Sequence, residues 1–476
     1  MDRAVRWHDY ITINAYWFAL TTRAQVLSPL VVPLLVQRFV GEQAKGAYFG
    51  LIRLWALMAA VLFQALMGLL SDRSTFRWGR RRPFVVIGTL GEVAVLVLIG
   101  FAANLQGMTG FWVLLPLYTF SMATSNTAHA AAQSLIPDLV PEDQRGRFSG
   151  IKVLLELPIP LIFVSFVVSR LVSAGNLWGT VYVLIAVLVG CMLVTLLVRE
   201  RPPERAPAPL EWRSLLRLVA MTGAFALIIL GIGAIVPVVL RQLHDLAPAA
   251  APISTAIVGV IGMGIAVALG VWLSVRISIG SDSRENPSFT WWVVNRLAFL
   301  VAANSLSGFM IYYLQERFEG FRGELAAGPT ARVMMAVGIC LLLAALPSGW
   351  LADRFGKKRL IAISGVLAAV GLSVVLLVPL LGAIYVGGCL IGTAIGVFYS
   401  ASWALGADIV PREEAGRYLG LANLAGAGAG AIGAYIGGPI ADHSGYGPLF
   451  AIYGAFFLLS ALALPGIRER GAPQLP

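Results

Sequence analysis

Charged side chains are scarce in this chain. Lys, Arg, Asp and Glu together make up 12% of the 476 residues, whereas hydrophobic residues make up 58%. Soluble domains average about 25% charged residues and roughly 45–50% apolar residues. The composition therefore excludes an ordinary water-soluble domain and indicates a polytopic membrane protein.

Cysteine is also rare. The three cysteines, Cys191, Cys340 and Cys389, all fall within apolar stretches. This pattern excludes a disulfide framework and is typical of small buried hydrophobic residues. Motifs of catalysis are missing as well, since the chain contains no HExxH, no GxSxG, no ATP-binding loop and no paired catalytic Asp within its spans. We therefore expect no enzyme activity, no cofactor and no metal ion.

Long apolar segments dominate what is present. Crossing a hydrocarbon core of about 30 Å takes around 20 helical residues. An unpaired peptide group in lipid costs several kcal/mol, so these segments are expected to be helices. We predict fourteen transmembrane spans, at 12–37, 47–71, 83–103, 111–135, 150–173, 178–198, 215–240, 253–277, 289–314, 332–352, 359–381, 383–407, 418–440 and 446–465.

Two loop patterns occur twice in the chain. The first reads GLLSDRSTFRWGRRR from Gly68 and GWLADRFGKKR from Gly349, and the second reads PDLVPEDQRGRFSG from Pro137 and ADIVPREEAGRYLG from Ala407. Corresponding residues of the second pattern are 270 positions apart. A nearly constant offset indicates that one half of the protein repeats the other.

The repeats predict an all-α polytopic membrane protein with two pseudo-symmetric six-helix bundles. The first bundle spans 1–200 and the second spans 288–476. The segment 201–287 joins them with a Pro-rich linker, which starts at Arg199 as RERPPERAPAP, and an inserted transmembrane hairpin. Because the two hairpin spans carry almost no polar side chains, we expect them to contact lipid.

The basic residues predict the topology. If the Asp-Arg loops face the cytoplasm, that side holds 25 Lys and Arg, the opposite side holds 7, and 3 lie inside spans. This is the positive-inside pattern, and it puts both termini in the cytoplasm. The net charge of +11 is thus explained by anionic lipid rather than by nucleic acid. The first span contains Arg23 and other polar residues, so we interpret it as a helix and not as a cleavable signal.

The two copies of G-x-x-x-D-R-x-G-R-[KR]-like sequence, each between the second and third helices of its half, resemble the major facilitator superfamily. The long first copy, SDRSTFRWGRRRPF, is similar to the branch of sucrose and other sugar–cation symporters. The resemblance implies a secondary transporter that moves a small organic solute by alternating access. Because the second span has no acid before Asp72, it does not resemble the sodium-coupled members, and we predict proton coupling. We expect a monomer in the cell membrane.

The resemblance also implies that the repeated loops act as gates. In the superfamily, such contacts latch the two halves and break as the protein opens to the other side. Setting the topology is the alternative role of their basic residues. The predicted gating residues are Gly68, Asp72, Arg73, Gly79, Arg80 and Arg81 in the first copy, and Gly349, Asp353, Arg354, Gly356, Lys357 and Arg359 in the second.

Family members hold the solute near the bilayer midplane, on the first and fourth helices of each half. Polar residues at helical spacing on those spans are therefore candidates for solute binding, with helix-to-helix hydrogen bonding as the alternative. Arg23 points away from this face of the first span. The candidates are Asn14, Trp17, Thr21, Gln25, Ser121, Ser125, Asn126, His129, Gln133, Arg296, Asn304 and Trp403.

Two carboxylates lie inside predicted spans, Glu92 and Glu156. Charges in a membrane are costly and usually functional, and a carboxyl group in a low dielectric can titrate near neutral pH. Both are therefore candidate proton carriers. Lys152 precedes Glu156 by four residues, so a helical ion pair is the alternative for that residue.

Two other functions remain open. An efflux carrier for drugs or lipid-like compounds would suit the abundant Trp and Phe. A membrane receptor without transport activity would need no coupling residue. The solute itself is not identified by the sequence.

Overall fold

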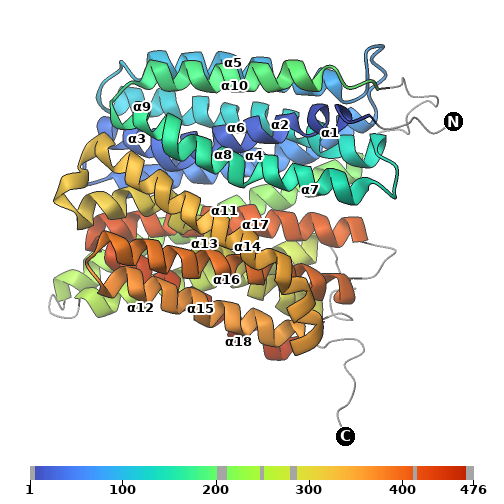
Figure 1. Ribbon diagram of the computed structural model, residues 1–476. Helices are drawn as coiled ribbons and strands as arrows, with labels where there is room; N and C mark the ends of the chain where they lie inside the picture. The colour runs from blue at the N-terminus through green and yellow to red at the C-terminus, as the bar shows by residue number, and fades with distance from the viewer. Residues whose placement is uncertain (1–5, 201–211, 247–250, 279–286, 411–414, 468–476) are drawn as a thin grey trace, which may run out of the picture. The chain divides into compact units, whose positions relative to one another are not determined.

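The computed structural model of the protein describes residues 6–200, 212–246, 251–278, 287–410 and 415–467 (Figure 1). These residues form helices joined by short loops, without a strand. Most of the Pro-rich linker, and Pro411 in the second repeated loop, lie outside the described residues.

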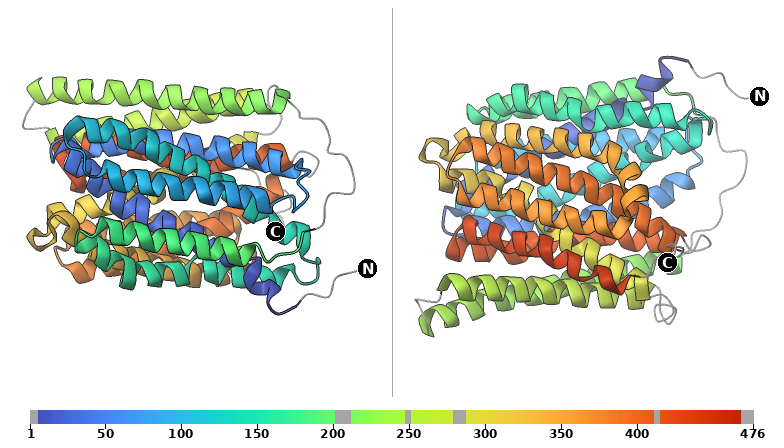
Figure 2. Two further views of the ribbon diagram at one scale, coloured as in Figure 1. Left: turned by 90° about the horizontal axis from the view of Figure 1, so that it is seen from above. Right: turned by 60° about the horizontal axis from the view of Figure 1, so that its bottom comes forward.

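The chain folds into two compact units. Unit 1 comprises residues 1–41, 55–216 and 320–335, and unit 2 comprises residues 42–54, 217–319 and 336–476. The inserted hairpin thus groups with the second repeat. Within each unit the long helices run side by side along a common direction (Figure 2).

Unit 1 contains most of the first repeat. Its helices are α1 (Asp9–Thr12), α2 (Ala15–Val26), α3 (Val32–Val40), α4 (Lys45–Asp72, apart from its first ten residues), α5 (Arg82–Ala102), α6 (Gly107–Leu139), α7 (Arg145–Glu156), α8 (Pro158–Phe163), α9 (Ser169–Ser173) and α10 (Leu177–Thr195). Two π-helical turns, η1 (Leu27–Val31) and η2 (Val164–Val168), interrupt the expected spans 12–37 and 150–173. Pro29 lies within the first of these turns, where its missing N–H removes a regular helical hydrogen bond.

Unit 2 contains the hairpin and most of the second repeat. Its helices are α11 (Trp212–Leu246, mostly), α12 (Ala251–Ser278), α13 (Pro287–Arg317), α14 (Ala327–Phe355, from residue 336), α15 (Lys357–Leu377), α16 (Leu381–Ile409), α17 (Ala415–Ser444) and α18 (Tyr446–Leu462), with short 3₁₀ turns η5 (Glu319–Phe321), η6 (Gly323–Ala326, in unit 1) and η8 (Leu464–Gly466). Helix α13 packs against both α17 and α18. A Cβ added at Gly433 of α17 would lie 2.7 Å from the Val301 carbonyl oxygen, so this close approach requires glycine.

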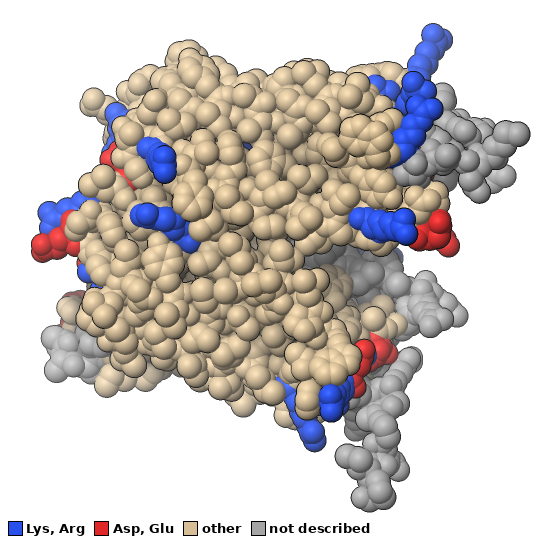
Figure 3. All heavy atoms as spheres, viewed as in Figure 1, with Lys and Arg blue, Asp and Glu red and all other residues tan. Residues whose placement is uncertain are grey.

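Twelve helical stretches among the described residues are long and apolar enough to cross a membrane. The two further predicted spans, 111–135 and 418–440, correspond to α6 and α17. On the face drawn in Figure 3, Lys, Arg, Asp and Glu gather toward the ends of the helices, and the broad area between them is uncharged. The protein is therefore an all-α polytopic membrane protein.

The inserted helix α12 has two different faces. It packs against α13, α17 and α18. Its other face exposes Ile253, Ile257, Ile261 and Ile265, which recur every four residues and thus form one stripe along the helix. An exposed apolar stripe on a membrane helix fits the predicted contact with lipid.

Candidate functional site

A cluster of aromatic and charged side chains from α2, α6 and α7 forms the main candidate site of unit 1. The Lys152 ammonium lies 3.8 Å from the centre of the Trp17 ring, and its Nζ lies 3.3 Å from Glu156 Oε2. His129 contacts the same indole edge to face, with ring centres 5.2 Å apart. The predicted candidates Trp17, His129 and Glu156 therefore lie together, joined by Lys152.

The members of this Trp17 cluster differ in their access to solvent. Trp17 is 4% exposed, and its buried Nε1 has no hydrogen-bond partner among the described residues. The Glu156 side chain is 35% exposed and that of Lys152 is 27% exposed. The Glu156 carboxylate is thus accessible to solvent, and the indole N–H of Trp17 is an unused donor within the described residues.

The second carboxylate of the spans, Glu92 on α5, is enclosed in a buried ion pair. Arg23 Nε donates to Glu92 Oε1 at 2.8 Å, and both side chains are almost completely buried. Ser121 and Thr124 of α6 each donate to the same carboxylate at 2.7 Å. Glu92 is therefore enclosed by three donor side chains, whereas the Glu156 carboxylate remains partly exposed.

The predicted polar stripe on α6 is divided between two environments. Ser121 is fully buried and is bound to Glu92 and Arg23. Toward the C-terminal end of α6, Gln133 is exposed. Its side-chain oxygen accepts a hydrogen bond from Gln64 at 3.3 Å. Ser121 therefore serves helix packing, which was the alternative role for these residues.

The remaining first-half candidates are largely buried. Asn14 donates to the backbone oxygens of Tyr10 and Phe148. Asn126 donates to the Met122 oxygen four residues earlier. Ser125 is buried, whereas Thr21 and Gln25 of α2 are half-buried.

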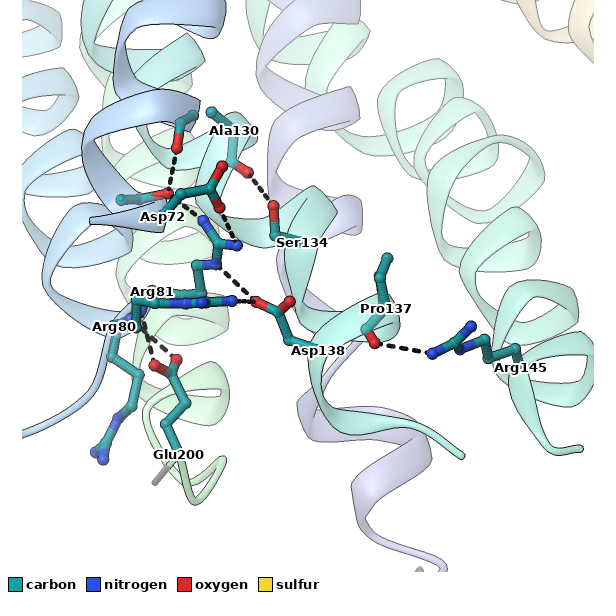
Figure 4. A network of polar contacts seen from close by, with 12 residues as sticks. Asp72, Arg80, Arg81, Ala130, Ser134, Pro137, Asp138, Arg145 and Glu200 are labelled. Atoms are coloured by element: carbon teal, nitrogen blue, oxygen red, sulfur yellow. Dashed lines mark hydrogen bonds and ion pairs between the residues drawn. The ribbon is translucent and has the colours of Figure 1, made fainter. Parts of the chain in front are cut away.

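A network of charged side chains connects the loop after α4 with the end of α6 (Figure 4). Arg81 forms an ion pair with Asp72, and its Nε lies 2.8 Å from Asp138 Oδ2 at the end of α6. Arg80 reaches the same Asp138 oxygen at 2.6 Å. Because Arg81 is buried whereas Asp72 is half exposed, the arginine is the centre of this network.

Glu200, which follows α10, joins this network by binding backbone N–H groups. Its carboxylate accepts from the Arg81 and Arg82 backbone N–H groups at 2.7 and 3.1 Å. Gly79 allows this approach, because its φ is +130° and an added Cβ would lie 2.8 Å from Glu200 Oε2. Only glycine adopts such a conformation easily.

Two other loop glycines, Gly68 and Gly349, lie in open surroundings. A Cβ added at either would meet no atom within 4 Å. Close packing therefore does not explain why the loops carry glycine there, and the gating role of both residues remains a prediction.

In unit 2, the second copy of the Asp-Arg loop, which starts at Gly349, forms one equivalent contact. Lys357 Nζ lies 2.5 Å from Asp408 Oδ2. Asp408 corresponds to Asp138 in the repeated sequence. In each half, therefore, a basic residue of the Asp-Arg loop binds the acidic residue at the start of the other repeated loop. Asp353 is exposed, Arg354 lies over the Trp350 ring, and Gly356 has a φ of +90°.

A cavity of about 410 Å³ adjoins the first network. It lies between α4 and α6 in unit 1. Its lining residues are Gln64, Gly68, Arg81, Ala130, Gln133, Ser134, Pro137 and Asp138. The predicted candidate Gln133 thus shares this cavity with Gly68 and Arg81, two of the predicted gating residues.

In unit 2, Arg296 of α13 lies among aromatic rings. Its guanidinium carbon is 4.3 Å from the Trp403 ring centre, 5.6 Å from that of Tyr399 and 5.7 Å from that of Trp292. The predicted candidates Arg296 and Trp403 therefore lie together. Asn304 instead donates to the Gly426 backbone oxygen at 3.0 Å, which joins α13 to α17.

Asp442 near the end of α17 caps the start of α4 within unit 2. Its two carboxylate oxygens accept from the Gly46 and Ala47 N–H groups at 2.8 and 2.7 Å. The residue lies beyond the predicted span 418–440, and burial raises its pKa from 3.8 to about 6. The neighbouring charged groups are Lys45, which lies over the Tyr312 and Tyr446 rings, together with Glu42 and Glu316.

The described residues contain no cluster of three or more His, Cys, Asp or Glu that could hold a metal ion. A profile of the Major Facilitator Superfamily matches residues 15–315 and 295–475. The chain belongs to the Major Facilitator Superfamily. This confirms the resemblance carried by the repeated loops.

Curated relatives match only part of the chain. It is 24% identical over 200 residues to Sucrose transport protein SUC3 of Arabidopsis thaliana, covering 34% of this chain and 32% of the relative. It is 32% identical over 105 residues to Sucrose transport protein SUT1 of Oryza sativa subsp. japonica, covering 17% and 18%. It is 38% identical over 78 residues to Solute carrier family 45 member 4 of Homo sapiens, covering 16% and 9%. The chain thus aligns with about a third or less of the length of these relatives.

Solved structures match the fold over nearly the whole chain. The POT family transporter PepTSo gives a TM-score of 0.67 at 12% identity, covering 97% of this chain and 98% of that one. The nucleoside transporter NupG gives a TM-score of 0.64 at 14% identity, covering 96% and 98%. At such low identity the likeness shows the fold alone.

Proposed function

We propose that this protein is a secondary transporter that moves a small, sugar-like organic solute by alternating access and couples this movement to protons. Membership of the Major Facilitator Superfamily supports the transport cycle. Relatives named as sucrose transport proteins favour a sugar-like solute.

The observation that carries proton coupling is the position of Glu156 in the Trp17 cluster. Its carboxylate is partly exposed and its nearest cation is Lys152, at 3.3 Å. Protonation of Glu156 would remove the ion pair and leave Lys152 held by the Trp17 ring. A side chain that changes partner with its charge can link proton binding to a change in the site.

Proteoliposomes test this role. We expect an imposed pH gradient to drive uptake by the wild type, and Glu156→Gln to abolish the dependence on the gradient while solute counterflow continues. Glu142→Gln is a matched control, because it makes the same change at a carboxylate that also pairs with a basic side chain, Arg145, but is 89% exposed. Equal gradient-driven uptake by wild type and Glu156→Gln would remove Glu156 from the coupling role.

The second candidate function is efflux of drugs or lipid-like compounds. The aromatic surroundings of Arg296 favour it, because Trp and Tyr rings accept flat apolar molecules. Counterflow with a sugar panel and a hydrophobic panel separates the two candidates. A protein that transports neither and signals on ligand binding would be a receptor instead.

We further propose that the protein is a monomer in the cell membrane, surrounded by lipid, with its repeated loops and both termini in the cytoplasm. The excess of basic residues on the loop side supports this orientation. A cysteine introduced at Thr75, which is exposed in the first loop, should react with membrane-impermeant thiol reagents only from the cytoplasmic side. Labelling from outside in intact cells would reverse the orientation.

A further inference from the structure

Arg296 carries a positive charge that no described acidic side chain neutralises. The residue is 4% exposed. Its Nε is buried and has no hydrogen-bond partner in the described part of the chain, and its Nη1 lies 3.5 Å from Ser402 Oγ, the outer limit of a hydrogen bond. Most of the hydrogen-bonding capacity of this guanidinium is therefore unused within the described residues.

The buried arginine of unit 1, Arg23, has an acidic partner within the chain. Arg23 is also buried, but its Nε donates to the Glu92 carboxylate at 2.8 Å. Removing a charge from water is unfavourable unless a counter-ion and hydrogen bonds compensate for the loss. Because intramembrane charges without a partner are rare and usually functional, Arg296 differs from Arg23 in a way that indicates a ligand.

The aromatic rings around Arg296 offset only part of this cost. A cation–π contact stabilises the charge but fills none of the N–H donors of the guanidinium. Trp292 is held in place because its Nε1 donates to the Ser402 backbone oxygen at 3.0 Å. Tyr399 and Trp403, in contrast, are only half-buried, so these two rings extend from the buried guanidinium to the accessible surface of unit 2.

We propose that Arg296 binds the carboxylate of an acidic solute, with the Tyr399 and Trp403 rings packed against the body of that solute. A guanidinium edge presents two parallel N–H donors that match a planar carboxylate. A bound carboxylate would fill the unused Nε donor and neutralise the charge. The inference rests on the proposed function, since it assigns a class of solute to the same transporter.

Matched pairs of acids and neutral compounds test the assignment on the purified full chain. Suitable pairs are D-glucuronate and D-glucose, lactate and propane-1,2-diol, and benzoate and benzyl alcohol, with D-glucose 6-phosphate as a phosphate probe. We expect at least one carboxylate to raise the melting temperature, whereas its neutral partner does not. That acid should also be taken up by proteoliposomes.

Substitutions at Arg296 make the test specific. A charge-assisted bidentate contact is worth about 10–100-fold in affinity, so Arg296→Gln should weaken binding of the acid by about 100-fold and Arg296→Lys by about tenfold. Arg276→Gln is the control, because Arg276 also lies over a tryptophan, Trp272, but is exposed. If Arg296→Gln does not fold, the graded loss in Arg296→Lys still decides the question.

The outcomes separate this inference from the proposed function. No effect of any carboxylate on the wild type, or an equal effect on wild type and Arg296→Lys, overturns the carboxylate assignment. A phosphate effect without a carboxylate effect also overturns it. Uptake of neutral solutes that does not depend on Arg296 would leave the proposed function intact, whereas Arg296-dependent binding of the acid without any uptake would refute transport but support the site.

Discussion

The buried Arg23–Glu92 pair allows a quantitative test of what holds unit 1 together. Glu92 accepts from Arg23 at 2.8 Å and from Ser121 and Thr124 at 2.7 Å each. Glu92→Gln keeps the shape of the side chain but leaves the arginine as an uncompensated buried charge. Breaking a buried pair in this way costs about 3–5 kcal/mol, whereas replacing both partners with apolar residues of similar volume is often neutral or stabilising.

We therefore expect Glu92→Gln to lower the free energy of unfolding by about 3–5 kcal/mol. The double variant Arg23→Met with Glu92→Leu should recover most of this loss. Unfolding in mixed micelles, followed by helical circular dichroism, measures both. Glu142→Gln is the surface control, since Glu142 pairs with Arg145 at 3.4 Å but is 89% exposed, and we expect it to have little effect.

Two results would refute this reasoning. A fully stable Glu92→Gln would mean that Arg23 reaches water or another acceptor. A double variant no more stable than Glu92→Gln would mean that the hydrogen bonds from Ser121 and Thr124, and not the charge of Arg23, dominate the site. Loss of gradient-driven uptake in a stable Glu92→Gln would support the predicted role of Glu92 as a proton carrier.

The loop geometry and the Asp442 cap give two further predictions. Gly79→Ala should destabilise the protein by about 1–3 kcal/mol because φ is +130° and the new Cβ would meet Glu200, whereas Gly68→Ala should be tolerated; equal melting temperatures for the two variants would contradict this. Asp442 has a folded-state pKa of about 6, above its ordinary value of 3.8, so its contribution to stability is present below about pH 4 and is lost as pH rises through 6. Asp442→Asn should therefore flatten the melting temperature between pH 4 and 7 relative to wild type, and an unchanged pH profile would show that another group is responsible.

The sequence predicted the architecture well because two strong signals carry it. Apolar length defines a membrane helix almost independently of its neighbours, and the repeated loops align the two halves at a nearly constant offset. The predicted gating residues did not include the two equivalent acidic residues of the other repeated loop. Asp138 and Asp408 are 270 positions apart, and in the structure both bind a basic residue of the preceding loop.

The sites were harder to predict because their members are distant in sequence. Glu92 and Arg23 are 69 positions apart in the sequence. Arg296 of α13 contacts Trp403 of α16, about a hundred residues further along the chain. Helical spacing groups residues on one helix, but it does not say which faces of different helices meet. This is why Ser121 was assigned to a solute-binding face, whereas it binds the buried ion pair, and why Lys152 was not recognised as the link between Trp17 and Glu156.

The inserted hairpin has a consequence for how this chain can be rebuilt. Its two long helices, α11 and α12, are each long and apolar enough to cross a membrane, and two crossings return the chain to the side of the membrane that it left. Loss or gain of both helices would therefore leave the membrane orientation of the second repeat unchanged, whereas loss of one helix would invert it. A pair of membrane helices can therefore be added or removed together without inverting the helices that follow it.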